Sequence, residues 1–294
     1  MSETNCGANV SDWLRALALY PLPHHAISRL VGRLARLRWP PLKNALIKAF
    51  ARAYGVDLSE ADPARAEDYA DFNQFFTRPL VDGARPLPAA TNAIASPADG
   101  TLSQIGPIDG HQLFQAKGRH YGLGELLVER QLAERFTSGH FATIYLAPRD
   151  YHRVHMPLSG RLTHMAYAPG RLFSVAPHTT RTIPGLFARN ERVTAIFETA
   201  VGPMAVILVG AVCVAGIETA WHGLVTPPRG HDPARWDYSA QPRYYALGDE
   251  LGRFNMGSTA IVLLPRGTAR WRDDLHAGTS LRMGQPLGET LAHA

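Results

Sequence analysis

A glycine and a serine meet where a polar turn runs into an apolar, β-branched segment, within residues 252–265. Ser258 would therefore stand at the point where a loop enters a buried strand. Glycine adds no side-chain bulk and tolerates strained backbone, so the Ser258 hydroxyl can approach the carbonyl carbon of Gly257. An acyl shift of this kind would cleave the chain between Gly257 and Ser258. The alternative interpretation is an ordinary turn before a strand.

Two histidines, His152 and His155, lie between prolines within residues 148–157. The chain has neither an HExxH motif nor a Cys/His tetrad, so a metal is weakly supported and none is predicted. Histidine titrates near neutral pH, so one of the pair can act as a base for Ser258 while a carboxylate such as Asp99 orients it. No Gly-x-Ser-x-Gly elbow occurs, which argues against an ordinary serine hydrolase.

The elements that would position these residues are mostly short strands. Apolar, β-branched runs predict strands at residues 141–146, 162–167, 193–198, 205–214, 216–219 and 260–264. The apolar run at residues 204–217 is too short to span a membrane and too β-branched to prefer a helix. One clear helix is predicted in this half, at residues 123–136. Asp99-Gly100 is a hairpin signal, which gives Asp99 a purely structural alternative.

The first fifth of the chain is basic and amphipathic. Residues 13–56 hold eight arginines and lysines and no acidic residue, although the whole chain carries only +5. Apolar residues recur at helical spacing in residues 27–54, and Trp39-Pro40-Pro41 divides them into two helices. No apolar run approaches the roughly 20 residues of a membrane span, and the acidic, polar start does not resemble a secretory signal. The fold class we expect is α+β, with a mostly antiparallel β core and N-terminal amphipathic helices.

The basic segment predicts attachment to a membrane surface. We place it in residues 1–62, with a boundary near Asp62-Pro63, a short helix ending near Phe76, and a catalytic domain at residues 63–294. Leucine-rich faces with two tryptophans favour lipid over nucleic acid, so no nucleic-acid partner is predicted. The structural alternative is a helical hairpin that packs on its own domain and exposes a solvated arginine face.

Composition excludes several classes of protein. A chain of 294 residues that is 46% hydrophobic can bury a full core, which excludes a disordered protein. Cys6 and Cys213 form no CxxC pair and indicate neither a disulfide framework nor a cysteine zinc site, which fits a reducing compartment. The three lysines are Lys43, Lys48 and Lys117. Two of them lie in the basic helices, so a lysine-bound pyridoxal phosphate site has at most one natural candidate.

Several longer motifs occur in one order along residues 65–290. They are residues 72–86, Gln115-Ala116-Lys117-Gly118, residues 149–157, residues 186–192, and Gly252-Arg253-Phe254 followed by Gly257-Ser258-Thr259. Together they resemble the bacterial phosphatidylserine decarboxylase proenzyme family. One departure is visible, because the family's usual Leu-Gly-Ser-Thr begins with Met256 here. Leucine to methionine nearly conserves volume, so this change puts little in doubt.

The resemblance implies a self-processing zymogen. Asp99 would hold His155, and His155 would take the proton of Ser258 as its hydroxyl attacks the Gly257 carbonyl and turns the peptide bond into an ester. Elimination at Ser258 would then release the Gly257 carboxylate. Loss of ammonia would leave a pyruvoyl group at the new N-terminus. This covalent group, derived from Ser258, would be the enzyme's cofactor.

The resemblance also implies the reaction and the partners. The pyruvoyl group would form a Schiff base with the amine of phosphatidylserine and accept electrons as carbon dioxide leaves, giving phosphatidylethanolamine in phospholipid biosynthesis. His152 would be the proton donor in decarboxylation. The mature enzyme would be a heterodimer of residues 1–257 (β chain) and 258–294 (α chain), held peripherally on the cytoplasmic face of the cell membrane. The alternatives are a lipid-active serine hydrolase and a non-catalytic membrane-binding module.

Overall fold

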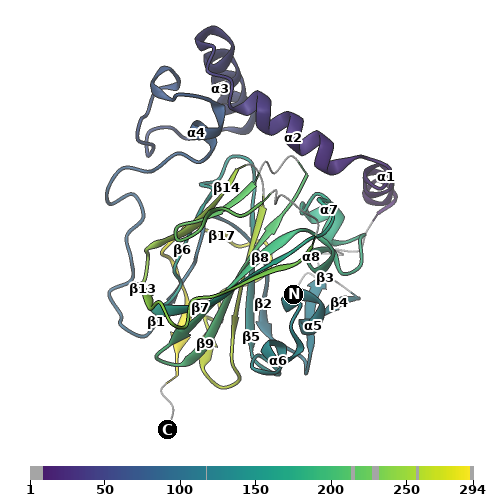
Figure 1. Ribbon diagram of the computed structural model, residues 1–294, viewed down its shortest axis with the longest axis vertical. Helices are drawn as coiled ribbons and strands as arrows, with labels where there is room; N and C mark the ends of the chain where they lie inside the picture. The colour runs from purple at the N-terminus through teal and green to yellow at the C-terminus, as the bar shows by residue number, and fades with distance from the viewer. Residues whose placement is uncertain (1–8, 117, 213–215, 227–231, 256–257, 292–294) are drawn as a thin grey trace.

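The computed structural model describes residues 9–116, 118–212, 216–226, 232–255 and 258–291. Five positions singled out from the sequence lie outside these residues: Cys6, Lys117, Cys213, Met256 and Gly257. Within the described residues the fold is α+β, as predicted, with mostly antiparallel sheets and helices gathered near the N-terminus. The first three helices lie together along one end of the molecule, next to the sheets (Figure 1).

The N-terminal helices follow the local sequence signals. They are α1 (Val10–Leu19), α2 (His24–Ala35) and α3 (Pro40–Tyr54). Asn9 caps α1 by accepting a hydrogen bond from the Asp12 N–H. Helix α3 begins at Pro40, a position where the missing N–H of proline costs no helical hydrogen bond. The predicted division of the segment at residues 39–41 is therefore confirmed. Gly55 ends α3 in the left-handed conformation, with φ of 66°.

The remaining helices are short. They are the 3₁₀ turn η1 (Ala66–Asp68), α4 (Phe72–Phe76), α5 (Leu123–Leu127), α6 (Arg130–Glu134), α7 (Pro177–Thr180) and α8 (Leu186–Arg189). Helix α4 confirms the predicted helix that ends near Phe76. Its phenylalanines pack with α2 and α3 into a small core of their own, in which Phe75 and Ile47 are fully buried.

One large antiparallel sheet forms the centre of the chain that follows the N-terminal helices. Its strands, in spatial order, are β12 (Ala234–Asp237), β7 (Gly160–Ala168), β8 (Arg192–Thr199), β9 (Gly202–Gly210), β15 (Ser258–Leu264), β5 (His140–Leu146), β2 (Gly100–Pro107) and β17 (Ser280–Leu281). Strand β13 (Arg243–Tyr245) also pairs with β7. Strand β15 is hydrogen-bonded on both sides, to β9 and β5.

Three smaller sheets complete the fold. The first contains, in spatial order, β11 (Gly223–Leu224), β10 (Gly216–Thr219), β14 (Glu250–Asn255) and β6 (Arg153–His155). The second contains β1 (Ala93–Ala95), β18 (Pro286–Thr290) and β16 (Ala269–Trp271). The third is β3 (Gln112–Ala116) paired with β4 (Arg119–Gly122). The sheet that contains β14 and β6 packs on one face of the large sheet, and α5, α6 and α8 pack on the other. Both faces of β15 are therefore buried, which explains its unbroken apolar run.

Three local predictions were wrong. Asp99-Gly100 is not a hairpin turn, because Gly100 begins β2, which pairs with β5 and β17, while β1 pairs with β18. A side chain at position 100 would collide with the Tyr145 carbonyl, so close backbone approach accounts for this glycine. The helix predicted at residues 123–136 is two helices, interrupted where Val128 adopts a left-handed φ of 68°. The strand predicted at residues 205–214 ends earlier, because β9 stops at Gly210, whereas β10 occupies residues 216–219 as predicted.

Candidate active site

Ser258 is the first residue of β15, which confirms that it begins a buried strand. The polar turn predicted before it is wrong for residues 252–255, which lie in β14. It pairs with Leu146 of β5 and Gly210 of β9, so backbone hydrogen bonds on both sides fix it. Its side chain is fully buried, and its hydroxyl has no hydrogen-bond partner among the residues that the structure describes. A buried hydroxyl without a partner is costly in a core and is unusual in a purely structural role.

A cavity of about 310 Å³ lies against Ser258. Its walls are mostly apolar and come from segments far apart in the sequence: Phe50 and Tyr54 of α3, Phe76 of α4, Tyr145 and Leu146 of β5, Pro148, residues 174–176, and residues 211 and 212. The basic N-terminal segment thus supplies part of the wall around the candidate nucleophile. A cavity of this size admits a small polar headgroup.

His152 lies directly before β6 and is fully buried. Its Nδ1 is 2.8 Å from the Asp150 carbonyl oxygen, which can only accept, so Nδ1 carries the proton and Nε2 does not. Nε2 has no partner within the described part of the chain. The His152 ring packs 4.1 Å from the ring of Phe76, centre to centre, and burial lowers the pKa of His152 to about 3. His152 is therefore a neutral imidazole with a free lone pair at physiological pH.

His155 ends β6 and has partners at both ring nitrogens. Nδ1 is 2.8 Å from the Gly248 carbonyl oxygen, and Nε2 is 3.0 Å from the Tyr151 hydroxyl. Burial lowers the pKa of His155, against the opposing effect of the bond to Gly248. Because β6 runs antiparallel to β14, His155 lies opposite Glu250, whereas the His152 carbonyl accepts from Phe254. His152 is thus nearer the end of β14 that leads towards Ser258.

Asp99 lies just before β2 and is held by three donors. Arg85 donates from Nε and Nη2 to the two carboxylate oxygens, at 2.8 and 2.6 Å, and the Met283 N–H donates to one of them at 2.8 Å. Arg85 also donates to Glu60 at 2.8 Å. Asp99 and Tyr151 line one charged cavity of about 220 Å³. The carboxylate is therefore held in place by an arginine fork.

The predicted residues gather at one end of the large sheet without forming a hydrogen-bonded relay. Thr101 of β2 and Thr259 of β15 both pair with Tyr145 of β5, one on each side of it. Asp99 and Ser258 therefore lie at the same end of these strands, separated by two strand spacings, or about 10 Å. The His155 N–H donates to the Pro97 carbonyl, two residues before Asp99. No side-chain hydrogen bond joins Asp99, His155 and Ser258 to one another among the described residues. The relay stays a prediction.

Sequence reasoning missed the residues that hold this group in place. Arg85 and Tyr151 stand inside motifs already singled out, but nothing local marks them as partners of Asp99 and His155. Asn255, two residues before Gly257, is fully buried. Its amide nitrogen donates to Glu218 and its amide oxygen accepts from Asn73, both at 2.9 Å. These bonds fix the strand that leads into the cleavage site, and only the folded structure identifies them.

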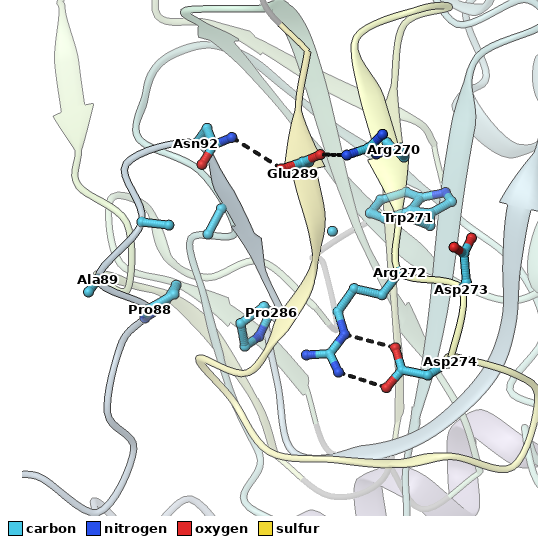
Figure 2. A pocket seen from close by; sticks show the side chains of 13 residues that line it. Pro88, Ala89, Asn92, Arg270, Trp271, Arg272, Asp273, Asp274, Pro286 and Glu289 are labelled. Carbon is cyan, nitrogen blue, oxygen red and sulfur yellow. Dashed lines mark hydrogen bonds and ion pairs between the residues drawn. The ribbon is translucent and has the colours of Figure 1, made fainter.

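A larger cavity, of about 910 Å³, lies at the opposite end of the molecule between β1, β16 and β18 (Figure 2). Its two arginines are already paired: Arg270 with Glu289, and Arg272 with Asp274, to which it donates at 2.6 and 2.9 Å. Asp273 also lines this cavity, but no histidine, serine, threonine or cysteine within the described ranges does. No cluster of three or more potential metal ligands occurs in the described residues. We therefore place the candidate site at Ser258.

Comparison with known proteins identifies the family of the chain. The family model described as phosphatidylserine decarboxylase matches residues 72–289, and a second model, described as PSD, matches residues 14–55. A phosphatidylserine decarboxylase proenzyme from Methylococcus capsulatus is 55% identical over 270 residues, covering 92% of this chain and 94% of that protein. Proteins of the same name from Saccharophagus degradans and Pseudomonas fluorescens are 52% and 53% identical, over 93% and 95% of this chain and 96% and 98% of their own. The resemblance seen in the sequence is confirmed, and the chain belongs to the phosphatidylserine decarboxylase family.

Proposed function

We propose that this chain cleaves itself between Gly257 and Ser258, converts Ser258 into a pyruvoyl group, and then decarboxylates phosphatidylserine to phosphatidylethanolamine. The observation that carries the proposal is the Ser258 hydroxyl, which is buried and unpartnered among the described residues at the start of a central strand. The relatives named as proenzymes support it, because that name denotes a precursor.

In the processing step the Ser258 Oγ attacks the Gly257 carbonyl carbon. The bond to the Ser258 nitrogen breaks, an ester bond to Oγ forms, and the hydroxyl proton passes by way of a base to the released amine nitrogen. We assign that base to His155, with Asp99 supplying a nearby negative charge that favours the protonated imidazole. His155 is suited to the task because its Nε2 carries a lone pair.

The residues around Ser258 fit the group that would replace its side chain. The cavity beside Ser258 leaves space for a small planar group and, with its apolar walls, excludes much of the water that would compete for protons. When formed, the pyruvoyl group supplies a ketone that condenses with the substrate amine and a carbonyl that takes up the electrons released with carbon dioxide. His152 is our candidate for moving the substrate proton. Burial keeps its Nε2 unprotonated in the free enzyme, so the proton that it would deliver to the carbon that has lost carbon dioxide must first reach it from the substrate or from water.

Cleavage would leave two chains that stay together. Residues 258–294 contribute β15, whose backbone is paired with β5 and β9 in the middle of the large sheet. The same segment contributes β17 and β18, which pair with β2 and β1. Removing β15 would break hydrogen bonds on both its edges and expose both its apolar faces. We therefore infer a heterodimer of residues 1–257 and 258–294 that separates only on unfolding.

The N-terminal helices are placed for work at a membrane surface, which we propose to be the cytoplasmic face of the cell membrane. They dock on the catalytic domain: Arg181 donates to Asp12 of α1 at 3.0 Å, and His25 of α2 lies 3.0 Å from the Gly170 carbonyl oxygen. Their other faces expose large apolar side chains, with Trp39 64% and Leu14 63% accessible. No helix among the described residues is both long and apolar enough to cross a bilayer.

The basic charge of the same helices favours an anionic leaflet. Each lysine or arginine near such a surface contributes about 1 kcal/mol. Residues 13–56 carry no acid of their own, although Lys43 is buried and Lys48 is paired with Glu67, so not all eight basic residues are available to lipid. Phe50 and Tyr54 of α3 also line the cavity at Ser258. A lipid headgroup drawn from the surface beneath these helices would therefore have a short path to the reactive group. The surface segment and the site act as one unit in this proposal.

The proposed reaction is tested with vesicles of phosphatidylserine and phosphatidylcholine. We expect the purified protein to release carbon dioxide and form phosphatidylethanolamine, and prior treatment with a carbonyl-reducing or carbonyl-trapping reagent to abolish both. A serine hydrolase would release fatty acid or headgroup, react with a phosphonate at Ser258 and ignore carbonyl reagents. A membrane-binding module would change no lipid. Either of those two patterns would contradict the proposal.

Membrane attachment should depend on the exposed apolar residues of α2 and α3 more than on salt. Replacing Leu30 and Trp39 together by serine removes two side chains that are 57% and 64% accessible. We expect at least a tenfold loss of sedimentation with anionic vesicles, because burial of each in the interface is worth roughly 1.5–3 kcal/mol. High salt should weaken attachment of the unaltered protein without abolishing it.

The matched control is Tyr244→Ser, which removes an equally exposed apolar side chain, 76% accessible, from β13 on the catalytic domain. That variant should sediment like the unaltered protein. Equal losses for both variants would mean that the surface as a whole, rather than the helical segment, contacts lipid.

A further inference from the structure

The imidazole of His155 is held at both nitrogens by groups other than Asp99. The Gly248 carbonyl oxygen faces Nδ1 at 2.8 Å, and the Tyr151 hydroxyl faces Nε2 at 3.0 Å. Asp99 has its carboxylate oxygens occupied by Arg85 and the Met283 N–H. Asp99, which was expected to orient His155, therefore makes no direct hydrogen bond to the His155 ring.

The chemistry of the two partners fixes the protonation of the ring. A backbone carbonyl can only accept, so the proton of neutral His155 resides on Nδ1. Nε2 is then an acceptor, and the Tyr151 O–H must be the donor. Tyr151 is itself buried, and burial raises its pKa to about 12, so its hydroxyl keeps the proton that it donates. The lone pair that would receive the Ser258 proton is the one that Tyr151 engages.

The turn that supplies the carbonyl is built for this contact. Gly248 has a φ of 85°, which side-chain-bearing residues rarely adopt, and a Cβ there would meet the Leu87 side chain. The Gly248 N–H donates to the Met156 carbonyl at 3.0 Å, which fixes the turn beside β6. The position of the Nδ1 partner is therefore set by the backbone rather than by a mobile side chain.

We propose that Tyr151 is a positioning residue of self-cleavage, whose hydroxyl holds His155 in the tautomer with its lone pair on Nε2. The proposal rests on the function assigned to His155 above and adds the residue that prepares it. Tyr151 and His155 are four residues apart, and their rings lie 5.6 Å apart, centre to centre, at 30°. A second hydrogen bond at the ring edge, donated by Tyr151, fixes the rotation of the imidazole, which the single bond to the Gly248 carbonyl would leave less constrained.

The pKa of His155 depends on the charged groups around it as well as on the Tyr151 hydroxyl. Glu250 on β14 and Asp99 before β2 favour the protonated imidazole, whereas Arg153 on β6 opposes it. The Tyr151 O–H stabilises the neutral form by donating to its lone pair. Without that donor the pKa of His155 rises, and a smaller fraction of the ring is a free base at a given pH. Self-cleavage would then require a higher pH.

The test uses Tyr151→Phe in the full-length chain. Precursor made in a short cell-free translation is diluted into buffers between pH 5 and 9, and cleavage is followed on a gel. We expect the variant to cleave about five- to tenfold more slowly near neutral pH, from the loss of one hydrogen bond to the base. We also expect the midpoint of its pH profile to move upward, so that alkaline buffer restores much of the rate. The midpoint does not depend on how much protein folds.

The matched control is Tyr238→Phe, which removes another tyrosine hydroxyl that faces a histidine ring, 3.2 Å from Nδ1 of His222. It should leave both rate and midpoint unchanged. An unaltered midpoint and rate for Tyr151→Phe, beside an unaltered chain that cleaves, would overturn the role of Tyr151 alone. An unaltered chain that never yields the fragment of residues 258–294 would overturn the proposed function and this role together.

Discussion

Replacing Ser258 by alanine is expected to leave the chain in one piece of 32.2 kDa and to abolish decarboxylation. The alanine has no oxygen to attack the Gly257 carbonyl, so neither the ester nor the group derived from it can form. Folding should be preserved. The Ser258 hydroxyl has no partner among the described residues, so its removal breaks no hydrogen bond there and relieves the cost of burying it.

The unaltered protein should instead give a small fragment of residues 258–294. In proportion to its share of the chain, this 37-residue fragment weighs about 4 kDa. Intact mass measures both fragments, and the small one should resist N-terminal sequencing because its first residue has no amine. Thr259→Val is the matched control, since Thr259 is the next residue, equally buried and also without a partner in the described structure. Finding only an intact chain with an unmodified Ser258 in the unaltered protein would contradict the proposal.

Elements whose causes are local in sequence could be predicted from it. The basic helices α2 and α3 were predicted because apolar spacing and a proline at the first helical position act within one or two turns. Strand β15 was predicted because both its faces are buried, which leaves a continuous apolar run. Helices α7 and α8 have four residues each, too few to display any period, and tertiary contacts specify them.

Local sequence gave wrong predictions where contacts with distant residues determine the backbone conformation. Asp99-Gly100 has the composition of a turn, but Gly100 is required by the approach of the Tyr145 carbonyl from a strand that lies 45 residues on in sequence. The division of residues 123–136 depends on one valine in a left-handed conformation that no local pattern favours. In both cases packing overrides the local preference.

The candidate site, like the fold, could be predicted from the sequence only in part. The family resemblance predicts roles for Ser258, His152, His155 and Asp99, but not which atoms meet. Asp99 is bonded to Met283, 184 residues away, and Asn255 to Asn73, 182 residues away. Such contacts follow from the assembled sheets. They determine that Arg85 holds Asp99, while Tyr151 holds His155.

Alanine at position 155 and alanine at position 152 should separate processing from decarboxylation. His155→Ala or Asp99→Ala is expected to accumulate uncleaved precursor, with decarboxylation lost as a consequence. His152→Ala should still cleave, at least in part, because its proton is needed only after carbon dioxide has left. Its decarboxylation rate should fall by roughly 10² to 10⁴, the usual contribution of a positioned acid or base. A gel for cleavage beside a carbon dioxide assay measures both effects.

The position of the two histidines makes the opposite assignment of their roles a real alternative. His152 lies about 10 Å further along the strands than His155, towards the end of β14 that leads to Ser258. His152→Asn keeps an N–H donor for the Asp150 carbonyl and so separates loss of the Nε2 lone pair from loss of packing. Exposed His222 is the control, and its alanine variant should behave like the unaltered protein. If His155→Ala matures normally while His152→Asn stays uncleaved, then His152 is the base that receives the Ser258 proton. His155, with its lone pair held by Tyr151, would then serve only to support the strand.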